Sequence, residues 1–186
     1  IPESGKQARG KLISNLIKLS NDEKVSIVIK VREFEENRKL FFITRDGKVK
    51  KTDLTLFANI NKAGIRALTL NGEDELTYIG LTSGNHKNEI FIATRNGVAI
   101  RFSEEDVRSM GRTAAGVKGI DLRKDDIVVA AAIIDPAIGE EEFNKLSVLT
   151  VTEEGYGKRT KLGEYRVQSR GGKGIIRSEE HTSELQ

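Results

Sequence analysis

The sequence contains no cysteine and no tryptophan, and it has only two prolines and two histidines among 186 residues. The lack of cysteine excludes disulfides, thiolate zinc sites and cysteine nucleophiles, and it fits a reducing compartment such as the cytoplasm. No apolar run approaches the roughly 18 residues that a membrane-spanning helix requires. We therefore expect neither a disulfide-rich scaffold nor a membrane partner.

Charged residues, in contrast, are plentiful, with 31 Lys and Arg against 28 Asp and Glu. The last ten residues, 177–186, match the in-frame translation of a common sequencing-adapter oligonucleotide, and we exclude them from fold reasoning as a non-native tail. The remaining 30 basic and 25 acidic residues give a net charge of +5. The chain starts with IPESGKQARG, without Met or an apolar signal core, so we expect it to begin inside a longer protein.

Three stretches of the chain share one form: an apolar run, a Thr, two polar residues, a Gly and a short run with basic residues. They are FFITRDGKVKKT (41–52), IFIATRNGVAIRF (90–102) and VLTVTEEGYGKRT (148–160). Their glycines stand 50 and 58 residues apart, and a second set of glycines, at 10, 64, 116 and 174, recurs with similar steps. Acidic turns followed by apolar runs form a third repeating feature. Such self-similarity indicates a repeat architecture.

Each repeat contains about four short apolar runs that are rich in Val, Ile and Phe, as buried strands are. Asp46-Gly47 and Asn96-Gly97 predict two-residue hairpin turns in which both residues have positive φ. Helical periodicity is scarce, and 103–110 predicts about one helical turn. We expect an all-β, propeller-like array of four-stranded antiparallel blades. Three blades are predicted at 1–61, 62–110 and 111–167, and the start of a further blade at 168–176.

The loop YRVQSRGGKGII (165–176) concentrates glycines and cations, and three interpretations compete: a nucleotide phosphate loop, a flexible linker and a nucleic-acid contact. A phosphate loop needs Ser or Thr after the Lys and a helix behind it, and this loop has neither. His86 stands alone in a loop, and the acidic runs at 103–106 and 140–142 are expected in solvated turns. We predict no metal, no cofactor and no catalytic constellation.

The tyrosines give no catalytic signal either. Tyr78 alternates with apolar neighbours and is expected in the core. Tyr156 and Tyr165 lie among basic residues and are expected to line a surface, with no base placed to activate them.

Basic residues recur in phase with the repeat, after the marker glycines and in the second set of glycine loops. In a propeller, equivalent positions lie around one perimeter, so these cations would form a basic rim that follows a curved polyanion such as double-stranded DNA. The adjacent glycines would let backbone amides approach phosphates. The alternative is a merely solvated surface. The expected rim comprises Lys50, Lys51, Arg101, Arg112, Lys118, Lys158, Arg159, Arg170 and Lys173.

From Ile1 to Ile176 the sequence resembles the C-terminal DNA-wrapping domain of the A subunit of DNA gyrase, most specifically in GYGKRTKLGEYRVQSRGGKGI. Within it, QSRGGKG (168–174) is similar to the family's Q-R-R-G-G-R/K-G box, with Ser169 in place of the first basic residue. By its order in the chain it resembles a later, box-like repeat. The resemblance implies DNA contact for Gln168, Arg170, Gly172 and Lys173.

The resemblance also implies a β-pinwheel of about six blades that wraps double-stranded DNA around its edge. It implies bacterial, cytoplasmic partners: the B subunit together with the rest of the A subunit, two of each, which supercoil DNA negatively at the expense of ATP. The catalytic tyrosine and the site for ATP and Mg²⁺ belong to other parts of that enzyme. Two alternatives stay open: the matching domain of topoisomerase IV, and a propeller used for protein–protein interaction.

Overall fold

The computed structural model describes residues 5–20, 23–59, 61 and 63–176. Within these residues the chain is nearly all β, as the sequence predicts. The strands are β1 (Lys39–Thr44), β2 (Lys48–Asp53), β3 (Leu76–Leu81), β4 (Glu89–Thr94), β5 (Val98–Ser103), β6 (Val117–Lys118), β7 (Val128–Ile134), β8 (Ser147–Val151), β9 (Gly157–Lys161) and β10 (Ile175–Ile176). The helical elements are α1 (Glu140–Lys145) and the 3₁₀ turns η1 (Ile13–Asn15), η2 (Leu54–Phe57), η3 (Glu104–Asp106), η4 (Pro136–Ile138) and η5 (Leu162–Glu164).

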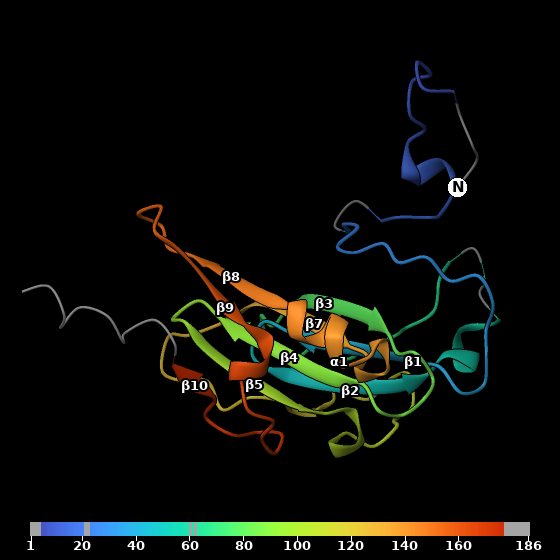
Figure 1. The fold of residues 1–186 in the computed structure, drawn as a ribbon. Helices are drawn as coiled ribbons and strands as arrows, with labels where there is room; N and C mark the ends of the chain where they lie inside the picture. Colours follow the sequence, from blue (N-terminus) through green and yellow to red (C-terminus); the bar gives the residue numbers. More distant parts are fainter. Residues whose placement is uncertain (1–4, 21–22, 60, 62, 177–186) are drawn as a thin grey trace, which may run out of the picture.

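The strands form two four-stranded sheets and one hairpin. The first sheet has the order β3-β1-β2-β6, the second β10-β5-β4-β7, and β8 pairs with β9 alone. All these pairings are antiparallel. In Figure 1 the hairpin β8–β9 extends beyond the strands of both sheets. The first sheet takes strands from both sides of the expected limits at 61/62 and 110/111, and the second takes strands from both sides of 110/111 and 167/168, so a sheet and a contiguous repeat are different segments of the chain.

The registers of the three hairpins establish which positions correspond. Phe42 pairs with Lys50, Ile92 with Ile100, and Thr150 with Lys158. We call the hairpins β1–β2, β4–β5 and β8–β9, each with its following 3₁₀ turn, units 1, 2 and 3. Three sets of equivalent positions follow: Lys50, Ile100 and Lys158; Lys51, Arg101 and Arg159; and Leu54, Glu104 and Leu162, which begin η2, η3 and η5.

The turns of units 1 and 2 differ from the expected two-residue type. Gly47 and Gly97 have φ of 79° and 75°, but neither Asp46 nor Asn96 has positive φ. Each glycine amide donates to the carbonyl three residues earlier, with Gly47 N 3.1 Å from Thr44 O. These are three-residue loops that end on a left-handed glycine, which is the next most common hairpin connection.

The core lies in layers between the sheets. Successive side chains of a strand point to opposite faces, so Phe41 of β1 and Ile90 of β4 meet in the layer between the two sheets. Leu40 faces the other side of the first sheet, which residues such as Ile29 and Leu68 cover. Phe91 packs between the second sheet and unit 3. Both faces of each sheet are therefore buried.

Several local expectations are resolved by this packing. Tyr78 packs against the core as expected, and Tyr156 is 73% exposed, whereas Tyr165 is buried and its ring stands edge-on to Phe91 at 5.1 Å. Tyr165 therefore lines no surface. Residues 140–142 start helix α1 in place of a turn, and residues 104–106 form the single helical turn that was expected. No helix in the described part of the chain could cross a membrane.

Candidate nucleic-acid interface

Two lysines of the expected rim lie inside the protein. The Lys50 side chain is 1% exposed, its ammonium donates to the carbonyls of Ala67, at 2.6 Å, and Arg112, and it lies 5.3 Å from the Phe42 ring centroid. Lys51 is 7% exposed and donates to the carbonyl of Glu104 at 2.8 Å. Burial lowers the pKa of Lys50 to about 8, and burial also lowers the pKa of Lys51.

Arg101 is buried in the same way. Its guanidinium pairs with the Glu89 carboxylate, with Nε and Nη2 at 2.6 and 2.5 Å from Oε2. Nη1 donates to the carbonyl of Tyr165 at 3.0 Å, and the guanidinium lies 4.8 Å from the Phe143 ring centroid. Protein groups thus occupy the donors that a phosphate would use.

These placements correct the expectation of an exposed rim at Lys50, Lys51 and Arg101. The hairpins of units 1 and 2 are covered on both faces, so each strand position points into a packed layer, cations included. A buried charge remains stable only when it is paired or hydrogen-bonded, and each of the three is. The charge pattern in the sequence could not separate a cation facing water from one facing a neighbouring unit.

A prediction follows from the buried Lys50, whose place Ile100 takes in unit 2. Between pH of about 8 and 10.5 the unfolded chain holds a proton on this lysine that the folded chain has lost, so the free energy of unfolding rises with pH. Relative to a Lys50→Ile variant, the wild type should gain up to about 3 kcal/mol over this range. Urea unfolding of both proteins at several pH values measures this gain. A difference that stays constant with pH would contradict it.

The exposed cations of the expected rim include a cluster on two adjoining segments, 117–121 and 168–174, which we call the loop pair. The segments are joined by backbone hydrogen bonds, from the amide of Gly171 to the carbonyl of Gly119 at 2.7 Å and from Asp121 to Gly172 at 2.9 Å. Arg170 adds a bond from its Nη1 to the carbonyl of Lys118 at 2.5 Å. The box-like stretch at 168–174 therefore lies directly on the segment 117–121.

The loop pair presents its charge to solvent. The Lys118 side chain is 63% exposed and pairs with Asp121 at 2.6 Å, and Lys173 is exposed as well. The hydrogen bond from Lys118, with the charges of Lys118 and Lys173, holds the pKa of Asp121 below its usual value. An exposed ion pair contributes little to stability, so Lys118 can exchange Asp121 for a phosphate at small cost.

The other residues of the box-like stretch have structural roles, because they bond to or pack against neighbouring segments of the protein. Besides its bond to Lys118, Arg170 is half-buried and donates from Nε to the carbonyl of Asp106 at 3.0 Å. The backbone amide of Gln168 donates to the carbonyl of Arg101 at 2.7 Å. A Cβ on Gly174 (φ 72°) would lie 2.8 Å from the carbonyl oxygen of Ala99, so only glycine lets β10 pair with β5 here. The recurrence of glycine at 116 and 174 was the sequence signal for this structural role.

The remaining expected contacts are dispersed. Arg112 is half-buried, and Gly172 lies in the loop pair, where a Cβ would lie 3.4 Å from the Ser169 carbonyl oxygen and 3.6 Å from the Ile100 side chain. Lys158 and Arg159 are exposed, but they lie on β9 of the projecting hairpin and not on the loop pair. The structure therefore brings together Lys118, Gln168, Arg170, Gly172 and Lys173 in the loop pair, and the other expected contacts lie outside it.

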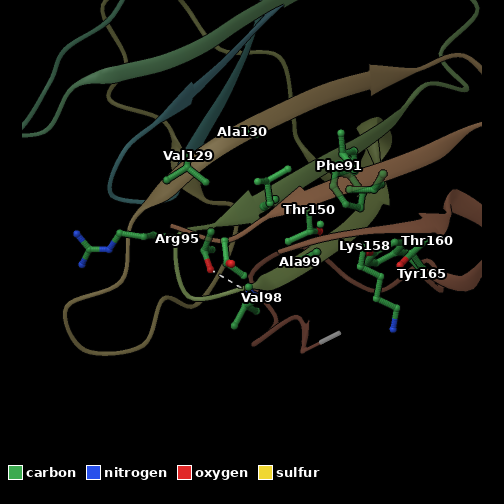
Figure 2. A pocket seen from close by; sticks show the side chains of 18 of the residues that line it. Phe91, Arg95, Val98, Ala99, Val129, Ala130, Thr150, Lys158, Thr160 and Tyr165 are labelled. Atoms are coloured by element: carbon green, nitrogen blue, oxygen red, sulfur yellow. Dashed lines mark hydrogen bonds between the residues drawn. The ribbon is translucent and has the colours of Figure 1, made fainter. Parts of the chain in front are cut away.

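An apolar groove of about 430 Å³ separates unit 3 from the second sheet. As Figure 2 shows, Phe91, Ala99 and Ala130 line it from the sheet, and Thr150 and Lys158 line it from the hairpin. Among the described residues, no group of three or more His, Cys, Asp or Glu is placed to hold a metal ion.

Comparison with a protein-family model gives a match over most of the chain. The model, described as "DNA gyrase C-terminal domain, beta-propeller", matches residues 1–32, 38–83, 88–135 and 147–176. The chain is 44% identical over 176 residues to the DNA gyrase A subunit of Lawsonia intracellularis and 47% identical over 176 residues to that of Staphylococcus epidermidis. These alignments cover 95% and 94% of this chain but 21% and 19% of those proteins, so the chain spans about a fifth of their length.

Two solved structures share the fold. The C-terminal domain of DNA topoisomerase IV aligns with a TM-score of 0.78 and 32% identity, over 90% of this chain and 49% of that one. A DNA gyrase A C-terminal domain aligns with a TM-score of 0.74 and 27% identity, over 90% of this chain and 53% of that one. The chain is thus similar to about half of each of these domains.

Proposed function

Because the chain belongs to the DNA gyrase C-terminal domain family, we propose that it binds double-stranded DNA without sequence preference and wraps it as part of a gyrase A subunit. The observation that carries this proposal on the molecule itself is the loop pair. There, Lys118 and Lys173 project into solvent beside the half-buried Gly171 and Gly172, and exposed cations of this kind are suited to phosphates. Recognition through phosphates positions a duplex and does not read its bases.

In this proposal Arg170 positions the loop pair, and Lys118 and Lys173 contact the phosphates. The buried Lys50, Lys51 and Arg101 contribute no contacts. The chain itself is not catalytic. It assists negative supercoiling by a bacterial, cytoplasmic enzyme of two A and two B subunits, in which the catalytic tyrosine and the ATP and Mg²⁺ sites lie in other segments.

The test is the salt dependence of binding. Each phosphate contact contributes about −0.9 to the slope of log affinity against log salt. A Lys118→Gln, Lys173→Gln double variant should therefore give a slope shallower by about 2. Its affinity for unrelated duplexes should fall by similar factors, roughly tenfold or more at 0.1 M salt. Fluorescence anisotropy with two duplexes of different sequence measures both quantities.

The matched control removes two equally exposed lysines elsewhere, Lys87 and Lys145, with the same substitution. Lys87 lies before β4, and Lys145 ends α1, where it pairs with Glu141 and Glu142. This control variant should keep the wild-type slope. Equal slopes for all three proteins would overturn the proposed interface. Wrapping is tested separately, since a wrap of one hand shifts the linking number of a nicked and religated plasmid in one direction.

The corresponding domain of topoisomerase IV is the second candidate, because the solved domain of that enzyme aligns with a TM-score of 0.78. Ser169 stands where the gyrase box has a basic residue, and this departure from the box is also compatible with the topoisomerase IV domain. The sequence upstream of Ile1 in the gene separates the two: an intact box there favours gyrase. If the DNA affinity of the chain is negligible at low salt, the protein-interaction alternative takes precedence.

A further inference from the structure

The sequence contains the dipeptide Asn-Gly twice, at Asn71-Gly72 and at Asn96-Gly97. Asparagine is a chemically labile residue. A glycine after it has no Cβ to hinder the approach of its backbone nitrogen to the asparagine side-chain amide. The local sequence therefore gives the two asparagines a similar reactivity, and it is their surroundings in the fold that distinguish them.

Hydrogen bonds hold the Asn96-Gly97 pair in place at the tip of hairpin β4–β5. The Gly97 amide donates to the carbonyl of Thr94 at 3.1 Å, and the Asn96 amide donates to Oδ1 of Asp126 at 3.0 Å. Gly97 is half-buried, and the next amide, that of Val98, donates to the Thr94 hydroxyl at 3.2 Å. The nitrogen that would attack the Asn96 side chain is thus already bonded, and it becomes available only when the tip opens.

The turn at Asn71-Gly72 leaves the corresponding atoms free. Both residues are exposed, as are Leu70 and Glu73 on either side of them. Gly72 has a φ of 59°, and beyond its chain neighbours no atom lies within 4 Å of the position that a Cβ would occupy. Among the described residues, neither the Gly72 amide nor the Asn71 side chain has a hydrogen-bond partner. Asn71 can therefore react without any opening of the fold.

We propose that Asn71 is a site of spontaneous modification, at which water converts the asparagine to aspartate or isoaspartate. The Gly72 nitrogen attacks Cγ of Asn71, so that an N–Cγ bond forms and the Cγ–Nδ2 bond breaks. The Gly72 amide proton leaves with the side-chain amino group as ammonia. Water then opens the five-membered imide, at Cγ to give aspartate or at the main-chain carbonyl to give isoaspartate. Nothing is oxidised or reduced, and water is the only co-reactant.

The modified turn supports the tip of unit 1. The Asn71 carbonyl accepts the Asp74 amide at 3.2 Å, and the Asp74 carboxylate accepts the Asp46 amide at 2.9 Å. The carbonyl of the next residue, Gly47, accepts the amide of Gly119 in the loop pair at 2.8 Å. Isoaspartate routes the main chain through the side chain and turns the Asn71 carbonyl into a free carboxylate, so the first of these acceptors moves. The change at position 71 thus reaches the loop pair through three hydrogen bonds.

The equivalent turn of unit 2 has the same bonds without the labile residue. The Arg123 carbonyl accepts the Asp126 amide at 3.2 Å, and the Asp126 carboxylate accepts the amide of Asn96 at the hairpin tip. Arg123 thus stands where unit 1 has Asn71, and an arginine side chain has no amide to lose. The modification should therefore affect the tip of unit 1 and leave the tip of unit 2 as it is. This inference does not depend on DNA binding.

The first test follows the reaction in the whole chain, aged at mildly alkaline pH and analysed by peptide mapping with mass spectrometry. In the folded chain Asn71 should convert about tenfold or more faster than Asn96, because the Gly97 amide must first open. In urea both dipeptides are free, and the two rates should agree within about twofold. Equal rates in the folded chain would overturn the assignment. An unchanged ratio in urea would also overturn it, since the difference would then come from the sequence.

The second test measures hydrogen exchange in the isoaspartate form, separated from the aged chain by ion exchange. Its amides at 45–48 and 119 should exchange about tenfold or more faster than in the unmodified chain. The matched control is Asn71→Asp, which adds the same charge without altering the main chain and should keep the protection. Equal losses in the two proteins would attribute the effect to charge and contradict the main-chain mechanism. Unchanged exchange in both would contradict the support of the tip by this turn.

Discussion

Replacement of Arg101 with Gln is expected to destabilise the chain by about 3–5 kcal/mol, as removal of one partner from a buried ion pair does. The substitution leaves Glu89 without its counterion and removes the side-chain donor from the carbonyls of Leu162 and Tyr165. Unit 3 should therefore loosen first. Chemical denaturation gives the total loss, and hydrogen exchange should show the largest change in residues 157–168.

The repeat supplies the control for this prediction. Arg159 occupies the equivalent position but is exposed, so Arg159→Gln should change the free energy of unfolding by less than about 0.5 kcal/mol. A double variant that also carries Glu89→Gln should recover part of the loss, because no unpaired carboxylate then remains. If Arg101→Gln lowers the free energy of unfolding by less than about 1 kcal/mol, the cation contributes little to the contact between units 2 and 3.

Replacement of Glu104 with Leu is expected to have the opposite sign and to stabilise the chain by about 1–3 kcal/mol, the cost of a buried polar group that has no hydrogen-bond partner. Glu104 is fully buried, and neither carboxylate oxygen has a hydrogen-bond partner among the described residues. The nearest ion-pair partner is His86, with Nδ1 3.7 Å from Oε1. The equivalent positions hold Leu54 and Leu162, both buried, so the site accepts this side chain.

The gain should depend on pH. Burial raises the pKa of Glu104, and the charges of Lys51 and His86 oppose that shift. The folded chain therefore keeps a proton that the unfolded chain loses near pH 4.5, and the wild type loses stability as the pH rises from there to the folded pKa. The advantage of Glu104→Leu should grow across that window and then level off. Thermal melts at a series of acidic to neutral pH values would show it.

Glu104→Gln serves as the control, since it removes the charge and keeps the shape and polarity. The neighbouring cation is Lys51, whose ammonium donates to the Glu104 carbonyl. If Glu104→Leu destabilises the chain at every pH, the carboxylate is a required counterion of Lys51, and the carbonyl contact alone does not hold that lysine.

The repeat and its strands could be predicted from the sequence alone. Apolar runs of Val, Ile and Phe, glycines about 50 residues apart and the box-like QSRGGKG were enough to predict an all-β propeller-like fold and its family. The hairpins lie where the marker glycines predicted them. Local patterns carry this information because strand formation and turn geometry depend on residues that are neighbours in sequence.

Which side of each strand faces water depends on the tertiary structure. Alternation along β2 and β5 defines two faces but not what covers them, and both faces are covered by segments distant in sequence, such as η3 over Lys51 and η5 over Arg101. The strand that completes each sheet also comes from a later repeat. Cations at equivalent positions of the repeat therefore differ in the structure. Lys51 and Arg101 are buried and donate to carbonyls of the next unit, whereas Arg159 is exposed, because burial depends on the neighbouring unit and not on the residue itself.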